Sequence, residues 1–118
     1  MKHIMLVAAH NAFREALAIR LSQEEDMEVA WQAGSIAETH NVHLDGIDVA
    51  VVDPLLPDGD GLALIREMSV ANPSALALVL CPKLDPVMHH QAVGAGAVEV
   101  LSTNASMEEL INTMRRAT

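Results

Sequence analysis

Asp53 is the residue whose type and position point most directly to chemistry. It follows the apolar residues 49–52, which are typical of a strand buried on both faces of a parallel sheet. The loop after it, residues 54–61, is rich in proline, glycine and aspartate. Sites of open α/β sheets lie at the carboxyl ends of the strands, so Asp53 is expected at such a site. A carboxylate there is able to act as a nucleophile toward a phosphoryl group.

Phosphoryl transfer needs more than a nucleophile. It needs a cation, normally Mg²⁺ bound by one or two carboxylates, and it profits from a Lys or Arg and from a hydroxyl donor. The other residues expected at this edge follow three further strands: Ala8, Ala9, His10, Cys81, Ser102 and Thr103. Asp53 is the only certain carboxylate in this set, and no lysine follows the last strand. The predicted site therefore has a candidate nucleophile but lacks the carboxylate ligands for a cation and the lysine that would assist it.

Four further residues near this edge need separate interpretation. Asp58 and Asp60 are candidate metal ligands, although turn and helix-cap roles suit their glycine-rich loop better. His10 is a candidate metal ligand or donor, and a place at the start of a helix suits it better. Cys81 is expected to be a small buried hydrophobic residue.

The elements that must position these residues alternate between strand and helix. Apolar strand patterns fall at residues 3–8, 27–31, 47–53, 76–81 and 97–101. A helix signal follows each strand. Asn11 is a candidate N-cap of the first helix, a capping box at 35–38 begins the second, which ends near Gly46, and the third is expected over 62–71. Asp85 with Pro86 begins the fourth helix, and a capping box at 106–109 begins the fifth. Five strand–helix units with short connections predict an α/β fold with a doubly wound five-stranded parallel sheet. We expect one domain over residues 1–118.

Composition excludes several classes of function. A formal net charge of −9 opposes direct binding of nucleic acid, and an aromatic content of 2% leaves no platform for base stacking. No apolar run reaches the roughly 18 residues that a membrane span needs. A lone cysteine, Cys81, fits a reducing compartment, so we expect a cytoplasmic protein without membrane contact.

The chain resembles the receiver domain of bacterial two-component response regulators over essentially its whole length. The resemblance is carried by residues 6–15, by residues 92–97, and by Asp53, Pro57, Asp60 and Gly61 at the family's spacing. It is strongest to regulators that have a helix-turn-helix output domain. The resemblance implies a flavodoxin-like fold with strand order 2-1-3-4-5, and a role in a phosphorelay that regulates transcription.

The chain departs from that family at most of the reactive positions. By the resemblance, the metal-binding acidic pair falls on Ala8 and Ala9, the switch Ser/Thr on Cys81, the lysine on Thr103 and the switch aromatic on Val100. Asp53 keeps the phospho-acceptor position, and we expect it to be inactive there. Mg²⁺ binding is expected to be weak or absent, and we expect no other metal, no other cofactor and no catalytic residue.

The sequence therefore predicts an atypical receiver, a pseudo-receiver that regulates without Mg²⁺-dependent phosphorylation. By the resemblance, its partners are a second copy in a homodimer, an output domain or another protein, with a histidine kinase as a further candidate. A working phospho-receiver that uses Asp53 and a sensor that binds a small effector remain alternatives. A phosphatase is the weakest hypothesis, because Leu55 stands where such enzymes need a second aspartate.

Overall fold

The computed structural model describes residues 1–41, 45–83 and 85–117 and has a five-stranded parallel sheet at its centre. The strands are β1 (Lys2–Val7), β2 (Met27–Ala33), β3 (Val49–Val52), β6 (Leu76–Cys81) and β7 (Ala97–Ser102). Their order is β2-β1-β3-β6-β7. Counting only these five in chain order, this is the predicted order 2-1-3-4-5, so the predicted fold class is confirmed.

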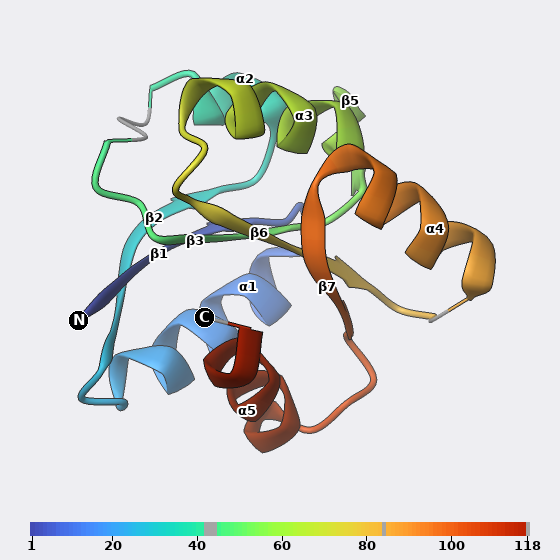
Figure 1. Ribbon diagram of the computed structural model, residues 1–118. Helices are drawn as coiled ribbons and strands as arrows, with labels where there is room; N and C mark the ends of the chain where they lie inside the picture. The colour runs from blue at the N-terminus through green and yellow to red at the C-terminus, as the bar shows by residue number, and fades with distance from the viewer. Residues whose placement is uncertain (42–44, 84, 118) are drawn as a thin grey trace.

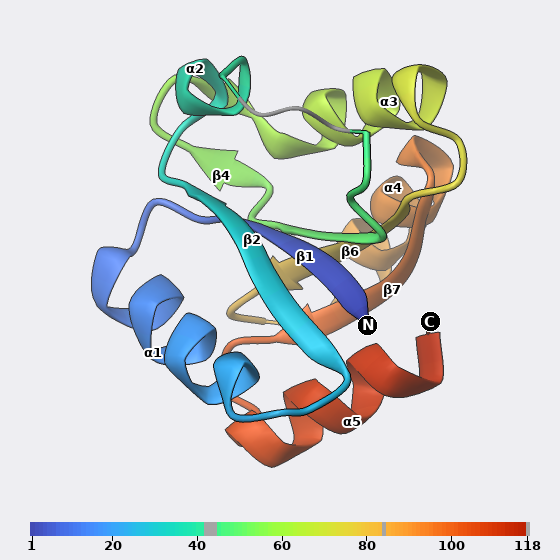
Figure 2. The same cartoon turned by 90° about the vertical axis from the view of Figure 1, so that its left-hand side faces the viewer.

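Helices cover both faces of the sheet (Figure 1). They are α1 (Asn11–Ser22), α2 (Ile36–Thr39), α3 (Gly61–Ala71), α4 (Pro86–Ala95) and α5 (Met107–Ala117). The pair α1 and α5 packs on one face, where Figure 2 shows the two helices next to each other. The helices α3 and α4 pack on the other face, and α2 lies on the same side.

Strand β3 is buried on both faces, as its apolar run predicted. Its side chains alternate between the two hydrophobic cores: Val49 and Val51 face α1 and α5, whereas Ala50 and Val52 face α3 and α4. All four residues are at most 1% exposed. This central strand ends just before Asp53 and therefore carries it to the carboxyl edge of the sheet.

The predicted starts of the helices are mostly confirmed by side-chain caps. Ser35, Asp85 and Ser106 accept hydrogen bonds from backbone amides at the starts of α2, α4 and α5. The prediction for α1 is wrong by one residue, because the N-cap is His10 rather than Asn11. Its Nδ1 accepts the amide of Phe13 at 3.1 Å, as a Ser or Asp oxygen would.

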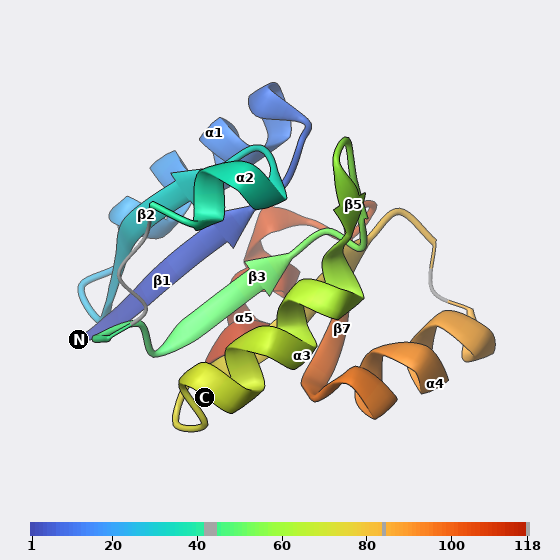
Figure 3. The same cartoon turned by 90° about the horizontal axis from the view of Figure 1, so that it is seen from above.

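Two further elements differ from the sequence prediction. Helix α2 ends at Thr39, with His40 as its C-cap, well before Gly46; the expected helix also included residues 42–44, which lie outside the described residues. A small antiparallel hairpin, β4 (Leu55–Leu56) and β5 (Gly59–Asp60), was not predicted. Figure 3 shows it beyond the carboxyl end of β3, so the loop after Asp53 is itself folded.

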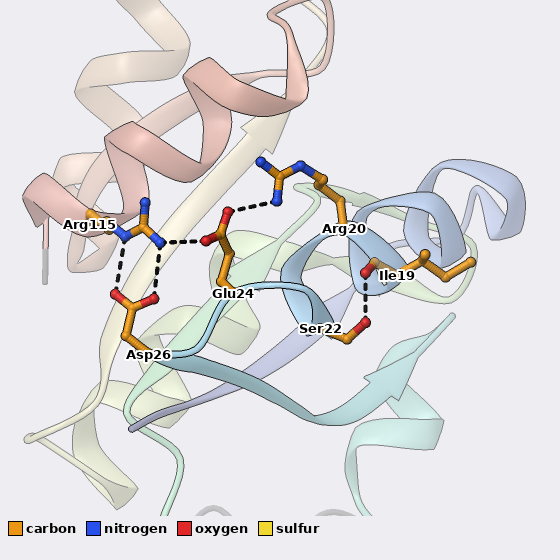
Figure 4. A network of polar contacts seen from close by, with 6 residues as sticks. All are labelled: Ile19, Arg20, Ser22, Glu24, Asp26 and Arg115. Carbon is orange, nitrogen blue, oxygen red and sulfur yellow. Dashed lines mark hydrogen bonds and ion pairs between the residues drawn. The ribbon is translucent and has the colours of Figure 1, made fainter.

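A network of ion pairs joins α5 to the turn before β2, at the edge opposite Asp53 (Figure 4). The Arg115 guanidinium donates to both oxygens of Asp26, at 3.0 and 3.1 Å, and to Glu24 at 2.8 Å. Glu24 also accepts from Arg20 at 2.6 Å. The bonds from Arg115 are the main reason that the pKa values of Glu24 and Asp26 lie below their usual range. Since exposed ion pairs stabilise proteins little, this network mainly orients the end of α5.

Two leucines test whether the central sheet or the small hairpin carries the stability. Leu78 in β6 is fully buried, whereas Leu55 in β4 is 76% exposed. We expect Leu78→Ala to lower the free energy of unfolding by about 2–5 kcal/mol, because it leaves a cavity in the core. Leu55→Ala is the matched control, with an expected change of about 0.5 kcal/mol or less. Urea unfolding followed by circular dichroism measures both, and equal losses would contradict the assigned core.

Candidate functional site

The candidate site is built on the folded loop that follows Asp53. The backbone of Gly61 lies directly against that of Asp53, and the Gly61 amide donates to the Pro54 carbonyl at 2.9 Å. A Cβ at Gly61 would collide with the Asp53 carbonyl, so this close approach requires glycine. The contact closes the loop on itself and fixes the backbone that carries the Asp53 side chain.

The two other aspartates of the loop stabilise helices, as predicted. Asp60 is the N-cap of α3 and accepts the Leu62 amide at 2.9 Å. The carboxylate of Asp58 accepts the amides of Ile36 and Ala37, each at 2.9 Å, and thereby joins the hairpin to the start of α2. These two bonds are the largest cause of the lowered pKa of Asp58. Both carboxylates thus accept backbone amides at helix starts, through both oxygens of Asp58 and through Oδ1 of Asp60.

The carboxylate of Asp53 is half-buried, and few polar partners offset the cost of removing its charge from water. Among the described residues, its one hydrogen-bond donor is the Leu55 amide, at 2.8 Å from Oδ1. Burial raises the pKa of Asp53, and the Leu55 amide lowers it less than burial raises it. No described Lys or Arg contributes to this pKa. The Asp53 carboxylate therefore has no cation beside it among the described residues.

A cavity of about 320 Å³ opens beside Asp53. It is lined by Ala8, His10, Phe13, Asp53, Leu80, Pro82 and Thr103. The structure thus brings together four of the residues predicted at this edge, Ala8, His10, Asp53 and Thr103. The other three predicted residues, Ala9, Cys81 and Ser102, do not line the cavity: Ala9 is exposed, Cys81 is 4% exposed and Ser102 is partly buried.

Cys81 behaves as a buried thiol rather than as a reactive one. Its Sγ donates to the carbonyl of Lys83 at 3.4 Å. Burial raises the pKa of the Cys81 thiol, and the negative charge of Asp53 raises it further. Because thiolate formation is disfavoured, Cys81 fits the expected role of a small hydrophobic residue.

Sequence reasoning missed the role of Arg14. Its guanidinium donates to the carbonyl of Ala8 at 2.5 Å and to the Gln32 side chain at 3.3 Å, so it ties α1 to the ends of β1 and β2. The signal that could have found it is spacing, since residue 14 lies one turn into a helix that starts at the loop after β1. Phe13, which lines the cavity, belongs to the same helix.

The response regulator receiver domain family matches residues 4–115 of this chain. The chain belongs to this family. The DNA-binding transcriptional activator DevR/DosR of Mycobacterium tuberculosis is 34% identical over 98 residues, which are 82% of this chain and 45% of that protein. The transcriptional regulatory protein UhpA of Escherichia coli is 31% identical over 110 residues, 92% of this chain and 54% of UhpA. The chain thus spans about half the length of these curated relatives.

Solved receiver structures share the fold. A DNA-binding response regulator of the LuxR family from Staphylococcus aureus superposes with a TM-score of 0.88 at 16% identity, covering 99% of this chain and 98% of that one. A two-component response regulator of the LuxR family from Aurantimonas sp. superposes with a TM-score of 0.87 at 22% identity, covering 97% of this chain and 82% of that one. At these identities the likeness supports the fold alone.

The side chains around Asp53 in this receiver domain do not provide the oxygen ligands that Mg²⁺ requires. At the positions that resemble the family's acidic pair stand Ala8 and Ala9, whose side chains offer no ligand atom. The described residues contain no group of three or more His, Cys, Asp or Glu side chains arranged to hold a metal ion. Mg²⁺ demands near-octahedral oxygen ligation and gives up its water reluctantly, so the single carboxylate of Asp53 is a poor substitute.

Gly61 and Gly94 provide a matched test of how this receiver site is built. The site needs glycine at 61, whereas a Cβ at Gly94 in α4 meets nothing within 4 Å. We expect Gly61→Ala to lower the free energy of unfolding by about 1–3 kcal/mol, because the Asp53 backbone must move. Gly94→Ala is expected to raise it by up to about 1 kcal/mol, since alanine favours the helix. Equal effects in urea unfolding would contradict the close contact.

Replacement of Asp53 by asparagine tests its electrostatic state. A carboxyl whose pKa is raised in the folded protein contributes stability below its unfolded pKa and loses it as the pH rises through the folded pKa. The asparagine amide would be neutral at every pH and would keep an oxygen for the Leu55 amide. We therefore expect Asp53→Asn to raise the free energy of unfolding at about pH 7, by a few tenths of a kcal/mol to about 1 after solvent screening, and to bring a smaller gain at about pH 4, near the unfolded pKa.

The control for this pH dependence is Asp45→Asn, at an exposed position before β3 on the opposite edge of the sheet. Urea unfolding of the three proteins at both pH values gives the comparison. A loss of stability in Asp53→Asn at neutral pH would mean that the carboxylate has a stabilising partner, and the assigned environment would be wrong.

Proposed function

We propose that this receiver domain is a pseudo-receiver, which regulates through protein contacts without Mg²⁺-dependent phosphorylation of Asp53. The observation that carries the proposal is the isolation of the Asp53 carboxylate, which has one backbone donor and no described cation that influences its pKa. A phosphoryl group would add negative charge where charge is already disfavoured by burial. The formal net charge of −9 adds to that repulsion.

The positions around Asp53 support the same conclusion. Ala8 and Ala9 cannot hold Mg²⁺, and the Thr103 hydroxyl cannot replace a lysine ammonium beside a phosphoryl group. Val100 offers no aromatic ring to move in response to phosphorylation. Because phosphoryl transfer depends almost entirely on such positioning and electrostatics, the missing groups remove most of the catalysis.

The proposed role is control of transcription through an output domain that lies outside this chain. Two curated relatives are named as transcriptional regulators, and this chain covers about half of each. The proposed partners are a second copy of the chain and the output domain, with a histidine kinase only under the phospho-receiver alternative. We propose a cytoplasmic location; among the described residues, no helix combines the length and apolar character that a membrane crossing needs.

Incubation with Mg²⁺ and a small phosphodonor such as acetyl phosphate, followed by intact mass spectrometry, tests the proposal. We expect no phosphoryl adduct on the native protein, because no bound cation neutralises the transferred group. The positive control is the triple variant Ala8→Asp, Ala9→Asp, Thr103→Lys, which restores the groups that the family resemblance implies. We expect this variant to accept a phosphoryl group on Asp53 and to lose that ability when Asp53→Asn is added.

The alternative function, a working phospho-receiver, makes the opposite prediction in the same experiment. Stoichiometric phosphorylation of the native protein that disappears in Asp53→Asn would establish the alternative and refute the pseudo-receiver. Circular dichroism of each variant shows whether it is folded, so that loss of the adduct is not confused with loss of structure.

A further inference from the structure

The cavity beside Asp53 has the size of a small-ligand site. Its volume of about 320 Å³ is at the lower end of the range for small-molecule pockets. It opens at the carboxyl edge of the sheet, between the ends of β1, β3, β6 and β7 and the start of α1. Ala8 contributes only a methyl group to its wall, which leaves this space open.

The lining of the cavity combines apolar walls and one carboxylate with the polar side chains of His10 and Thr103. Phe13, Leu80 and Pro82 supply apolar surface, and Asp53 supplies the carboxylate. The Leu55 amide occupies only Oδ1 of that carboxylate, so lone pairs remain for another donor. A ligand that fits this cavity therefore has an apolar body and at least one hydrogen-bond donor.

Charge decides what kind of donor fits best. None of the described residues that line the cavity is a Lys or Arg, so an anionic ligand would meet the Asp53 carboxylate without a permanently charged cation beside it. A cation would offset the charge that burial disfavours and would form a charge-assisted hydrogen bond. An inorganic cation would lack ligands, as the poor fit of Mg²⁺ illustrates, and would leave the apolar walls uncovered.

We propose that this cavity binds a small organic amine, with its ammonium group on the Asp53 carboxylate and its apolar body against Phe13, Leu80 and Pro82. The proposal rests on the proposed function, because a phosphoryl group on Asp53 would occupy the same space. It makes the domain a sensor whose signal is a bound cation rather than a covalent phosphate. The Thr103 hydroxyl, which belongs to the same lining, is available to a second polar group on the ligand.

NMR titration of the isotope-labelled protein tests the proposal with matched probes. The amines are phenethylamine, with an aromatic body, and isoamylamine, with an aliphatic one. Hydrocinnamate and phenethyl alcohol have the same phenylethyl group as phenethylamine, with a carboxylate or a hydroxyl in place of the ammonium. We expect at least one amine to shift the amide signals of Phe13, Asp53 and Thr103, with a dissociation constant on the order of a millimolar. The alcohol is expected to bind more weakly and the carboxylate not at all.

Two substitutions and a control locate the site. Asp53→Asn is expected to weaken amine binding by about tenfold or more, because the charge-assisted bond is lost. Asp45→Asn removes the same charge at the opposite edge of the sheet and is expected to leave binding within about twofold of the native protein, since exposed charges act weakly at that range. Thr103→Met fills the cavity without changing its charge and is expected to reduce binding as well.

The outcomes separate this proposal from the pseudo-receiver itself. Absence of shifts with both amines, equal binding of hydrocinnamate, or equal losses in Asp53→Asn and Asp45→Asn would each overturn the amine site. None of these results changes the phosphodonor experiment, in which the native protein either acquires a phosphoryl group or does not. A phosphoryl adduct on native Asp53 would instead overturn the pseudo-receiver, whatever the amines do.

Discussion

The close approach of Gly61 to the backbone of Asp53 is the constraint on which the site depends. Because glycine has no side chain, the two backbones can lie in contact and the loop can fold back on itself. The Gly61 amide then reaches the Pro54 carbonyl, and α3 begins at Gly61. The same turn places Asp58 where it caps α2. One steric requirement thus sets the position of a carboxylate, a hairpin and the starts of two helices.

This constraint is independent of the chemistry that the site performs. Gly61 and Asp60 shape the backbone and the start of α3, whereas the groups that would assist a phosphoryl group on Asp53 are side chains from the ends of other strands. Alanine at positions 8 and 9 is compatible with this close contact and with the caps, since the loop is held by backbone hydrogen bonds and packing.

The sequence was informative where a local pattern has one physical meaning. The run 49–52 had to be a doubly buried strand, and Asp85 followed by Pro86 had to start a helix. It was less informative where tertiary contacts decide. His10 caps α1 because its Nδ1 reaches the Phe13 amide, and the start of α2 is held by Asp58 from the hairpin. The site could be predicted as a set of strand ends, but not as a cavity, because Phe13 lines it from a helix and its place there follows from how that helix packs.

The remaining carboxylate explains why phosphate and a cationic ligand make opposite demands on this pocket. In a site with several carboxylates, mutual repulsion favours a bound metal, and the metal then favours a phosphoryl group. Among the described residues that line this cavity, Asp53 is the one carboxylate, and burial already disfavours its charge. A phosphoryl group would increase that unfavourable charge, whereas an ammonium group would neutralise it. On the proposal above, the preferred occupant is therefore a cation that binds Asp53 directly rather than an anion held by a metal.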